Sequence, residues 1–284
     1  MRIFDFQIKP LIYNALNEDI RGGDITTNAV LSLKNNDIMI CEVTAKKACT
    51  ICGLDIFSTV FEIVTKSNYF IDFYCSEGES VEPMQKVLLL KAKAGDILCG
   101  ERTALNFFQH MSGIATASRI ASNELRGLKT KILDTRKTIP GLRILQKYAV
   151  KIGGGENHRF DLSSGILIKD NHIKLAGGVR QAISAVKKFY SGLNFKIEVE
   201  TSDLKEVKEA AEAGADIIML DNMNTGMMKD AVKIIDNTAL TEASGNMTVE
   251  KLRDIAIGTG VDYISMGSLT NSVVPADFSL NFVL

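Results

Sequence analysis

The sequence lacks any long apolar segment and any excess of charge. No stretch of its 284 residues approaches 18 consecutive apolar residues, and the first twenty contain no apolar core of a secretory signal. We therefore expect a cytoplasmic protein with no membrane partner. The 33 Lys and Arg residues against 34 Asp and Glu residues give a formal net charge of −1. This balance gives no reason to expect nucleic acid as a partner, so any basic patch has to be local.

Cysteine is scarce, and the common nucleotide and zinc motifs are absent. The single C-x-x-C, Cys49 to Cys52, has no second pair and no spaced histidines that would complete a zinc site. An odd total of five cysteines in a chain taken as intracellular indicates reduced thiols. The sequence contains no G-x-x-x-x-G-K-S/T, no G-x-G-x-x-G and no H-E-x-x-H. Any phosphate or metal chemistry must therefore use another arrangement.

The pattern of predicted strands and helices changes near residue 131. Before it, β-rich runs at 37–53 and 69–95 precede one or two helices over 96–125, which indicates a mixed α+β region. After it, short apolar runs alternate with amphipathic helical stretches; the runs are 131–134, 166–170, 196–200, 216–221, 238–244 and 262–267. Pro140 is expected to open the first of these helices, and Thr248 to cap the last. Strands that alternate with helices predict a parallel sheet with helices outside.

An open doubly wound sheet and a barrel both fit this alternation. Polar residues stand at or just past the C-terminal end of each successive strand, from Arg136-Lys137 after the first to Gly267-Ser268 after the last. A barrel brings all of these ends to one face, whereas an open sheet brings only the strands beside its switch point near a ligand. The pattern therefore favours a barrel.

The region from Lys131 to His172 holds eight Lys and Arg residues against four acids. Three of the cations are spaced by four along a helix and are expected on its solvated face: Arg143, Lys147 and Lys151. Four others flank strand ends or loops of the expected active face: Arg136, Lys137, Arg159 and Lys169. Arginine binds carboxylate or phosphate in bidentate fashion and lysine supplies a point charge, so this set suits a small polyanion. The alternative is internal salt bridging to Asp134, Asp161 and Asp170.

Acids and glycines complete the expected site. Glu200 and Asp221 end neighbouring strands and suit Mg²⁺ if the ligand brings phosphates; otherwise they would pair with the lysines. Ser244-Gly245 and Met266-Gly267-Ser268 end the last two strands, where barrel loops commonly hold phosphate on backbone N–H groups.

The segments that carry these residues resemble a known family. They are GDITT (23–27), GERTALNFFQHMSGIAT (100–116), LDTRKTIPGLRILQKYAVKIGGGENHR (133–159), ILIKDNH (166–172), EVE (198–200), IIMLDN (217–222), EASGN (242–246) and DYISMGSLTNS (262–272). In this order they resemble quinolinate phosphoribosyltransferase, also called carboxylating nicotinate-nucleotide pyrophosphorylase, of the type II phosphoribosyltransferases. The sequence contains no Asp-Asp dipeptide, which argues against the diphosphoribosyl-binding loop of the other large class of phosphoribosyltransferases.

The resemblance implies a fold, an assembly and a reaction. The fold is an N-terminal α/β open sandwich, residues 1–107 completed by 272–284, and an incomplete parallel α/β barrel, residues 108–271. Each sandwich caps the barrel of the partner in a homodimer, which can assemble further. The reaction takes quinolinate and 5-phosphoribosyl 1-diphosphate, with Mg²⁺, to nicotinate mononucleotide, pyrophosphate and carbon dioxide.

The resemblance also implies residue roles. Those expected around the quinolinate carboxylates are Arg136, Lys137, His158, Arg159 and Lys169, with Arg102 reaching in from the neighbouring subunit. Thr135 is expected as a further substrate-binding residue. Glu200 and Asp221 would meet Mg²⁺ and the ribose hydroxyls, and together with Lys137 and Lys169 they are the catalytic set. The residues expected around the 5-phosphate are Ser244, Gly245, Asn246, Met266, Gly267 and Ser268.

Two departures and two alternatives accompany this interpretation. Asn246 stands where we expect a second glycine, and the segment from Gly267 to Asn271 differs from the G-A-L-T-H-S of many members. Both lie at the expected phosphate loop. One alternative is a paralogous phosphoribosyltransferase for another acidic heterocycle, such as the molybdate-transport-associated relative, although a monocarboxylate would not require so many cations. The other is a non-catalytic phosphate-binding barrel.

Overall fold

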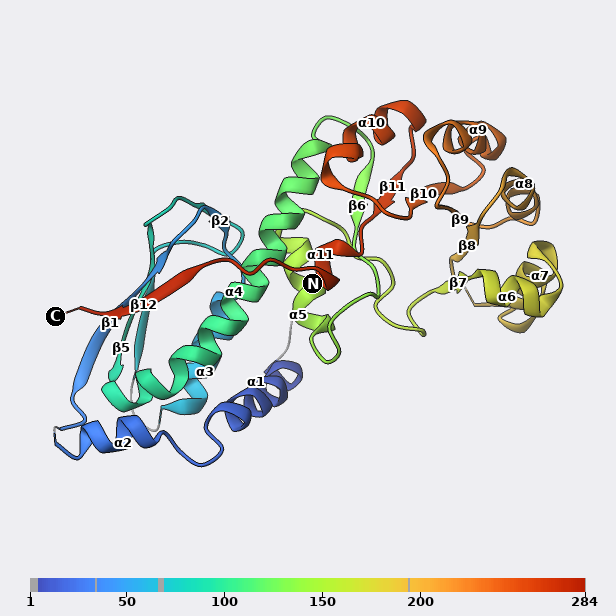
Figure 1. The fold of residues 1–284 in the computed structure, drawn as a ribbon. Coiled ribbons are helices and arrows are strands. Elements are labelled where there is room, and N and C mark those ends of the chain that lie inside the picture. The colour runs from blue at the N-terminus through green and yellow to red at the C-terminus, as the bar shows by residue number, and fades with distance from the viewer. Residues whose placement is uncertain (1–4, 34, 66–68, 194, 284) are drawn as a thin grey trace. The chain divides into compact units, whose positions relative to one another are not determined.

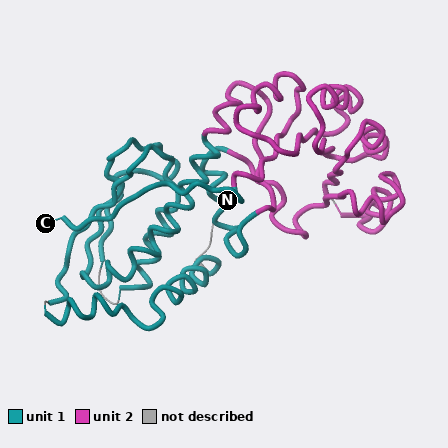
Figure 2. The backbone as a smooth tube through the Cα atoms, in the orientation of Figure 1, with its two compact units in different colours: residues 1–119, 138–154, 270–284 teal, residues 120–137, 155–269 magenta. Residues whose placement is uncertain are grey.

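The computed structural model describes residues 5–33, 35–65, 69–193 and 195–283 (Figure 1). The chain divides into two compact units (Figure 2). The first comprises Met1–Arg119, Thr138–Gly154 and Thr270–Leu284, and the second Ile120–Lys137 and Gly155–Leu269. The domain boundary predicted between residues 107 and 108 falls inside one long helix, α4 (Ala94–Glu124). Among the described helices, none combines the length and apolarity needed to cross a membrane.

The first unit contains a four-stranded antiparallel sheet in the order β12-β1-β5-β3. The strands are β1 (Ile38–Ala45), β3 (Phe70–Phe73), β5 (Lys86–Lys93) and β12 (Phe278–Phe282). Alternate residues of β1, from Cys41 to Ala45, are buried while their neighbours are not, as expected for a sheet with one covered face. The C-terminal tail supplies β12, which lies along β1.

Helices cover the buried face of this sheet. The unit's helices are α1 (Asp5–Asp19), α2 (Ile25–Leu31), α3 (Leu54–Val64), most of α4, and α5 (Arg143–Ile152), with the short strands β2 (Cys49–Thr50) and β4 (Ser80–Val81). Phe108 of α4 contacts Phe57 of α3 and Phe278 of β12, with ring centroids 5.8 and 4.5 Å apart. These aromatic contacts join helices and sheet into one core.

The prediction that α5 has a fully solvated basic face is wrong for Lys147. Its side chain is completely buried, whereas Lys151 is exposed and Arg143 is half-buried with its Nε donating to Thr138 Oγ1 at 3.0 Å. Residues on both sides of Lys147 are buried as well, so α5 packs on more than one face and leaves a narrow solvent stripe. The helix also begins at Arg143 rather than at Pro140, which lies in the preceding turn.

The second unit is built on a six-stranded parallel sheet. Its strands are β6 (Lys131–Leu133), β7 (Ile166–Ile168), β8 (Ile197–Thr201), β9 (Ile217–Asp221), β10 (Leu240–Ser244) and β11 (Tyr263–Ser265). The spatial order β7-β8-β9-β10-β11-β6 follows the chain and then returns to its first strand. In a doubly wound sheet the order of successive strands reverses at a switch point. No such reversal occurs in this sheet, so the order confirms the barrel. The ladder remains open between β6 and β7, which makes the barrel incomplete.

Helices surround the strands of this barrel on the outside (Figure 1). They are α6 (Asp170–Ala176), α7 (Val179–Phe189), α8 (Leu204–Glu212), α9 (Thr225–Ile235) and α10 (Val249–Thr259), followed by α11 (Ser268–Asn271). Asp203 and Asn224 cap α8 and α9 through side-chain oxygens. Thr248 occupies the N-cap position of α10 as predicted, without a side-chain hydrogen bond to the helix backbone.

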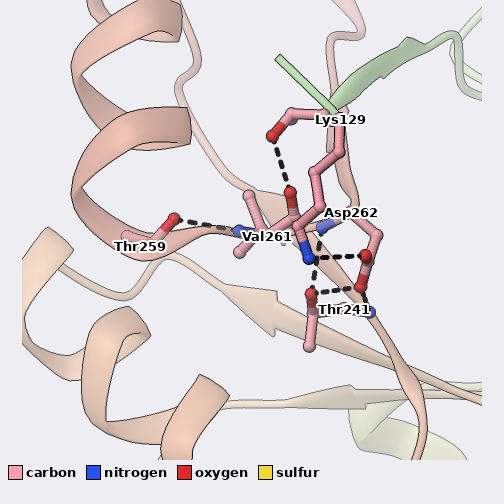
Figure 3. A network of polar contacts seen from close by, with 6 residues as sticks. Lys129, Thr241, Thr259, Val261 and Asp262 are labelled. Carbon is pink, nitrogen blue, oxygen red and sulfur yellow. Dashed lines mark hydrogen bonds and ion pairs between the residues drawn. The ribbon is translucent and has the colours of Figure 1, made fainter. Parts of the chain in front are cut away.

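A polar network fixes the N-terminal ends of β10 and β11 (Figure 3). The backbone N–H and Oγ1 of Thr241 donate to Asp262 Oδ2 at 2.9 and 2.8 Å, and Lys129 Nζ lies 3.0 Å from Asp262 Oδ1. Burial alone would raise the pKa of Asp262, but the hydrogen bonds from Thr241 and Lys129 hold that pKa below its ordinary value. An ionised Asp262 therefore anchors the start of these strands, and their C-terminal ends carry the polar residues discussed next.

Candidate functional site

A cavity of about 540 Å³ lies at the C-terminal ends of the barrel strands. Its volume is in the range of small-molecule sites. The residues that line it are Thr135, Arg136, Lys137, His158, Arg159, Leu167, Lys169, Glu200, Met219, Asp221, Asn222, Glu242, Ser244, Gly245, Asn246 and Ser265. Most of them come from β7 to β11 or from loops that follow barrel strands, including the loop after β6, as the barrel prediction required. His158 and Arg159 come from the loop between α5 and β7.

Eleven of the fifteen predicted site residues line this cavity, from Thr135 to Asn246. Arg102 lies exposed on α4 in the first unit. Met266 is buried, with its N–H donating to the Leu133 carbonyl at 2.9 Å, and Gly267 and Ser268 follow it outside the cavity lining. The structure adds lining residues that the prediction did not include: Leu167, Met219, Asn222, Glu242 and Ser265.

Two arginines give the cavity its positive charge. Arg159 Nη1 donates to the Gly165 carbonyl at 2.9 Å, which fixes the guanidinium against its own loop. The Nε atoms of Arg136 and Arg159 are both buried without a hydrogen-bond partner among the described residues. Burial, followed by the neighbouring charge of Arg136, lowers the pKa of Arg159. Two crowded guanidinium groups with unused donors are suited to an anion with several oxygens.

The residues of the Lys-Asp-Asn-His segment after β7 make contacts of two kinds. Lys169 Nζ lies 3.5 Å from Glu200 Oε2 in the cavity, with 46% of its side chain exposed. Asp170 is paired with Lys174 one turn along α6 at 3.0 Å, and His172 Nδ1 accepts the backbone N–H of Lys169 at 2.9 Å. Asp170 and His172 therefore shape the start of α6, while Lys169 faces the cavity.

Among the described residues, two of the three acids that the salt-bridge alternative named form no ion pair with the cavity cations. Asp161 accepts hydrogen bonds from Ser164 and Ser163, which lower the pKa of its carboxyl group to about 2. Asp170 is occupied by Lys174. Asp134 accepts Asn157 Nδ2 at 2.6 Å and the backbone N–H of His158 at 2.9 Å, and so holds the loop that carries His158.

The loop after β10 has the left-handed backbone that a tight anion cradle requires. Gly245 has φ +99°, and a Cβ there would lie 2.2 Å from Asn222 Oδ1. Asn246 has φ +48°, a conformation that asparagine tolerates better than most residues. The asparagine that departs from the expected second glycine therefore keeps a backbone that glycine adopts readily.

Glu200 and Asp221 bring two carboxylates to one wall. They end β8 and β9, which are neighbours in the sheet. Asp221 Oδ2 accepts Asn222 Nδ2 at 2.7 Å, and Glu200 is the partner of Lys169. Both side chains are partly exposed to the cavity, so their oxygens are accessible to a bound cation.

Comparisons with known proteins cover almost the whole chain. The family model described as quinolinate phosphoribosyl transferase, N-terminal domain, matches residues 24–112, and that of the C-terminal domain matches residues 114–281. A probable carboxylating nicotinate-nucleotide pyrophosphorylase of Bacillus subtilis is 38% identical, covering 98% of this chain and 94% of its own. One from Methanocaldococcus jannaschii is 39% identical, covering 98% of both chains. A solved nicotinate-nucleotide pyrophosphorylase from Francisella tularensis superposes with a TM-score of 0.93 at 37% identity, covering 99% of this chain and 98% of its own.

Proposed function

This chain belongs to the quinolinate phosphoribosyltransferase family, and on that premise we propose how its side chains divide the work of the reaction. It transfers the phosphoribosyl group of 5-phosphoribosyl 1-diphosphate to quinolinate, with loss of carbon dioxide, and forms nicotinate mononucleotide and pyrophosphate. The observation that carries the division of roles is the convergence on one cavity of four cations and of the strand-end carboxylates Glu200 and Asp221.

The cations bind the dicarboxylate. Arg136 and Arg159 offer planar donors that match carboxylate oxygens, and their buried Nε groups gain partners when an anion enters. His158, Lys137 and Lys169 line the same cavity and complete the shell around the pyridine ring. Because Lys169 is paired with Glu200 across 3.5 Å and is half exposed, it can exchange that partner for a substrate oxygen at small cost.

Glu200 and Asp221 fit a Mg²⁺ ion that arrives with the sugar diphosphate. Mg²⁺ is usually held by one or two carboxylates together with substrate phosphates and water, and two carboxylates on neighbouring strands meet this requirement. When bound, the ion would neutralise charge on the departing pyrophosphate. The same two side chains would accept hydrogen bonds from the ribose hydroxyls.

The 5-phosphate is placed by the loop after β10. Ser244 offers a hydroxyl, and Gly245 and Asn246 present backbone in the left-handed conformation that forms anion-binding concavities. Met266, Gly267 and Ser268, which precede or begin α11, stay a prediction for the far side of the phosphate.

Catalysis then rests on position and charge. As the bond from the anomeric carbon to pyrophosphate breaks, the sugar develops positive charge, and Lys137 and Lys169 neutralise the leaving group. The pyridine nitrogen, held by its carboxylates, forms the new bond to the same carbon. The 2-carboxylate leaves as carbon dioxide, its bonding electrons stay on the ring carbon beside the cationic nitrogen, and that carbon takes a proton.

We further propose a homodimer in which Arg102 completes the cavity of the partner. Arg102 is exposed on α4 and does not line the cavity of its own chain. A mixture of two inactive variants, Arg102→Ala and Lys137→Ala, should then recover activity, because some mixed dimers contain one site with both residues intact. No recovery from exchanged, folded dimers would remove Arg102 from the partner's site.

The direct test is a discontinuous assay with purified protein, quinolinate, 5-phosphoribosyl 1-diphosphate and Mg²⁺. Nicotinate mononucleotide that requires all three supports the proposal. Lys137→Ala should abolish turnover, whereas Lys151→Ala, an exposed lysine on α5, serves as the matched control. A folded protein that binds the sugar diphosphate but makes no product from quinolinate would favour the paralogous enzyme. A scaffold barrel would show thermal stabilisation by phosphate and none by quinolinate.

A further inference from the structure

Three buried side chains form a cluster beneath the cavity that the reaction described above does not fully use. They are His158, Glu198 and Glu242, and one polar atom of each lies within 4.8 Å of the others. Their side chains are 10%, 8% and 1% exposed. Glu198 and Glu242 come from β8 and β10, and His158 from the loop that follows α5. Burying two carboxyl groups at this depth costs free energy unless they are paired or hydrogen-bonded.

The cluster stands between two cavities of the barrel. His158 and Glu242 line the cavity of about 540 Å³ described above. The same two residues, with Glu198, also line a second cavity of about 290 Å³, whose other walls include Ile217, Leu240 and Tyr263 at the starts of β9, β10 and β11. The cluster is therefore the partition between the site and the opposite end of the barrel.

Distances within the cluster indicate a hydrogen bond rather than a shared metal ion. His158 Nε2 lies 2.7 Å from Glu198 Oε2 and 3.9 Å from Glu242 Oε2. The shorter distance is that of a charge-assisted hydrogen bond. Ligands that each sit about 2.0–2.2 Å from one metal ion stand roughly 3 Å or more from one another. With Nε2 as the donor, this hydrogen bond fixes the orientation of the His158 ring and keeps a proton on Nε2.

The charges of the cluster complement the arginines above it. The carboxylate of Glu198 attracts the Arg159 guanidinium, which is repelled by Arg136. Glu242 faces Glu198, Asp134, His158 and Ser265, and its carboxyl group lies buried among them. Burial, followed by the charge of Glu198, raises the pKa of Glu242. A neutral Glu242 leaves Glu198 as the one charged member of the glutamate pair, so the cavity above keeps its attraction for carboxylates.

We propose that Glu198 is a positioning residue that holds the His158 ring for quinolinate, and that the buried Glu242 packs beside Glu198 in the same cluster. The proposal rests on the proposed function in one respect, since it takes His158 as a quinolinate-binding residue. Glu198 touches no substrate in this scheme and acts through His158. Its effect on catalysis should disappear when His158 is absent.

A double-mutant cycle tests this dependence. Glu198→Gln should lower kcat/KM for quinolinate by about tenfold, because a misplaced ring loses its alignment, and should leave the KM for 5-phosphoribosyl 1-diphosphate within about twofold. In a His158→Asn background the same change should cost less than about twofold. Equal losses in both backgrounds would make Glu198 a structural residue and overturn the proposal. Glu242→Gln should retain more activity than Glu242→Ala, and Glu212→Gln, on the exposed surface of α8, is the matched control.

One measurement on the unaltered protein keeps the test independent of how the variants fold, and a metal titration compares that protein with Glu242→Ala. Histidine ¹⁵N spectra should show His158 with its proton on Nε2; a bare Nε2 would overturn the proposal. Titration with Zn²⁺ or Mn²⁺ should show no stoichiometric metal binding by the cluster. Stoichiometric binding that is lost in Glu242→Ala would mean that the cluster is a metal site, and would overturn the proposal. Wild-type protein that makes no product from quinolinate would refute the proposed function, while the spectra still decide the hydrogen bond.

Discussion

Replacing Glu242 with glutamine should change how the stability of the protein depends on pH. The carboxyl group is buried, and burial followed by the charge of Glu198 raises its pKa in the folded chain. In the unfolded chain a glutamate loses its proton near pH 4.3. A group whose pKa is raised by folding contributes stability that is fully present below the unfolded pKa and is lost as pH rises toward the folded pKa.

The size of the effect follows from the number of protons involved. While the folded chain keeps the Glu242 proton and the unfolded chain has lost it, the free energy of unfolding falls by about 1.4 kcal/mol per pH unit. Between pH 5.5 and 7.5 this contribution amounts to at most about 3 kcal/mol. Glutamine has a similar shape and no proton to lose, so the variant should gain up to that amount relative to the wild type across the interval.

Urea unfolding of both proteins at the two pH values measures the difference directly. The exposed Glu212→Gln variant, which removes a carboxylate from the surface of α8, should run parallel to the wild type. Parallel curves for Glu242→Gln as well would mean that Glu242 is ionised in the folded protein. The argument that Glu198 is the one charged member of the glutamate pair would then fail.

Three further changes have expected outcomes. Gly245→Ala would place a Cβ 2.2 Å from Asn222 Oδ1, so we expect the KM for 5-phosphoribosyl 1-diphosphate to rise at least tenfold, and an unchanged KM would exclude this loop from the phosphate site. Arg159→Lys should raise the KM for quinolinate about tenfold, because lysine lacks the bidentate fork, with the other substrate's KM as internal control. Asp262→Asn should lower the free energy of unfolding by about 1–3 kcal/mol near neutral pH, since Thr241 loses its ionised acceptor, and the loss should shrink in acid; a pH-independent loss would contradict the lowered pKa.

The alternation of strands and helices was sufficient to predict a parallel sheet, because parallel strands need a crossover between each pair. The polar residues at successive strand ends then favoured the barrel over the doubly wound sheet. Two local features could not be predicted from the sequence pattern. α6 begins at Asp170, directly after β7, without the turn residues that usually announce a helix. Lys147 was assigned to solvent by its spacing from Arg143 and Lys151, but α5 is packed on more than one side. The spacing of residues along a helix shows which side chains share a face of that helix, but not how many of its faces are packed against the rest of the fold.

Three of the five lining residues that the prediction missed lie at a fixed offset from predicted ones along the strands. Lys169, Asp221 and Ser244 stand where their strands end and were visible as polar residues after apolar runs. Side chains two positions apart point to the same side of a strand. Leu167, Met219 and Glu242 lie two positions earlier on those strands and line the deeper wall of the same cavity. Leu167 and Met219 look like ordinary core residues in the sequence, so their proximity to the site becomes evident from the barrel geometry.

Glu198 and Glu242 did carry a signal in the sequence, since each is an acid inside a strand that is otherwise buried. Glu198 stands two positions before Glu200, and Glu242 two before Ser244, so each acid shares the inward face of its strand with a residue of the cavity rim. An acid at such a position points into the barrel and needs a partner there. For Glu198 that partner is His158, at 2.7 Å. The rim residues are thus suited to contact the substrates, and the acids beneath them to set the orientation and charge of the groups that do.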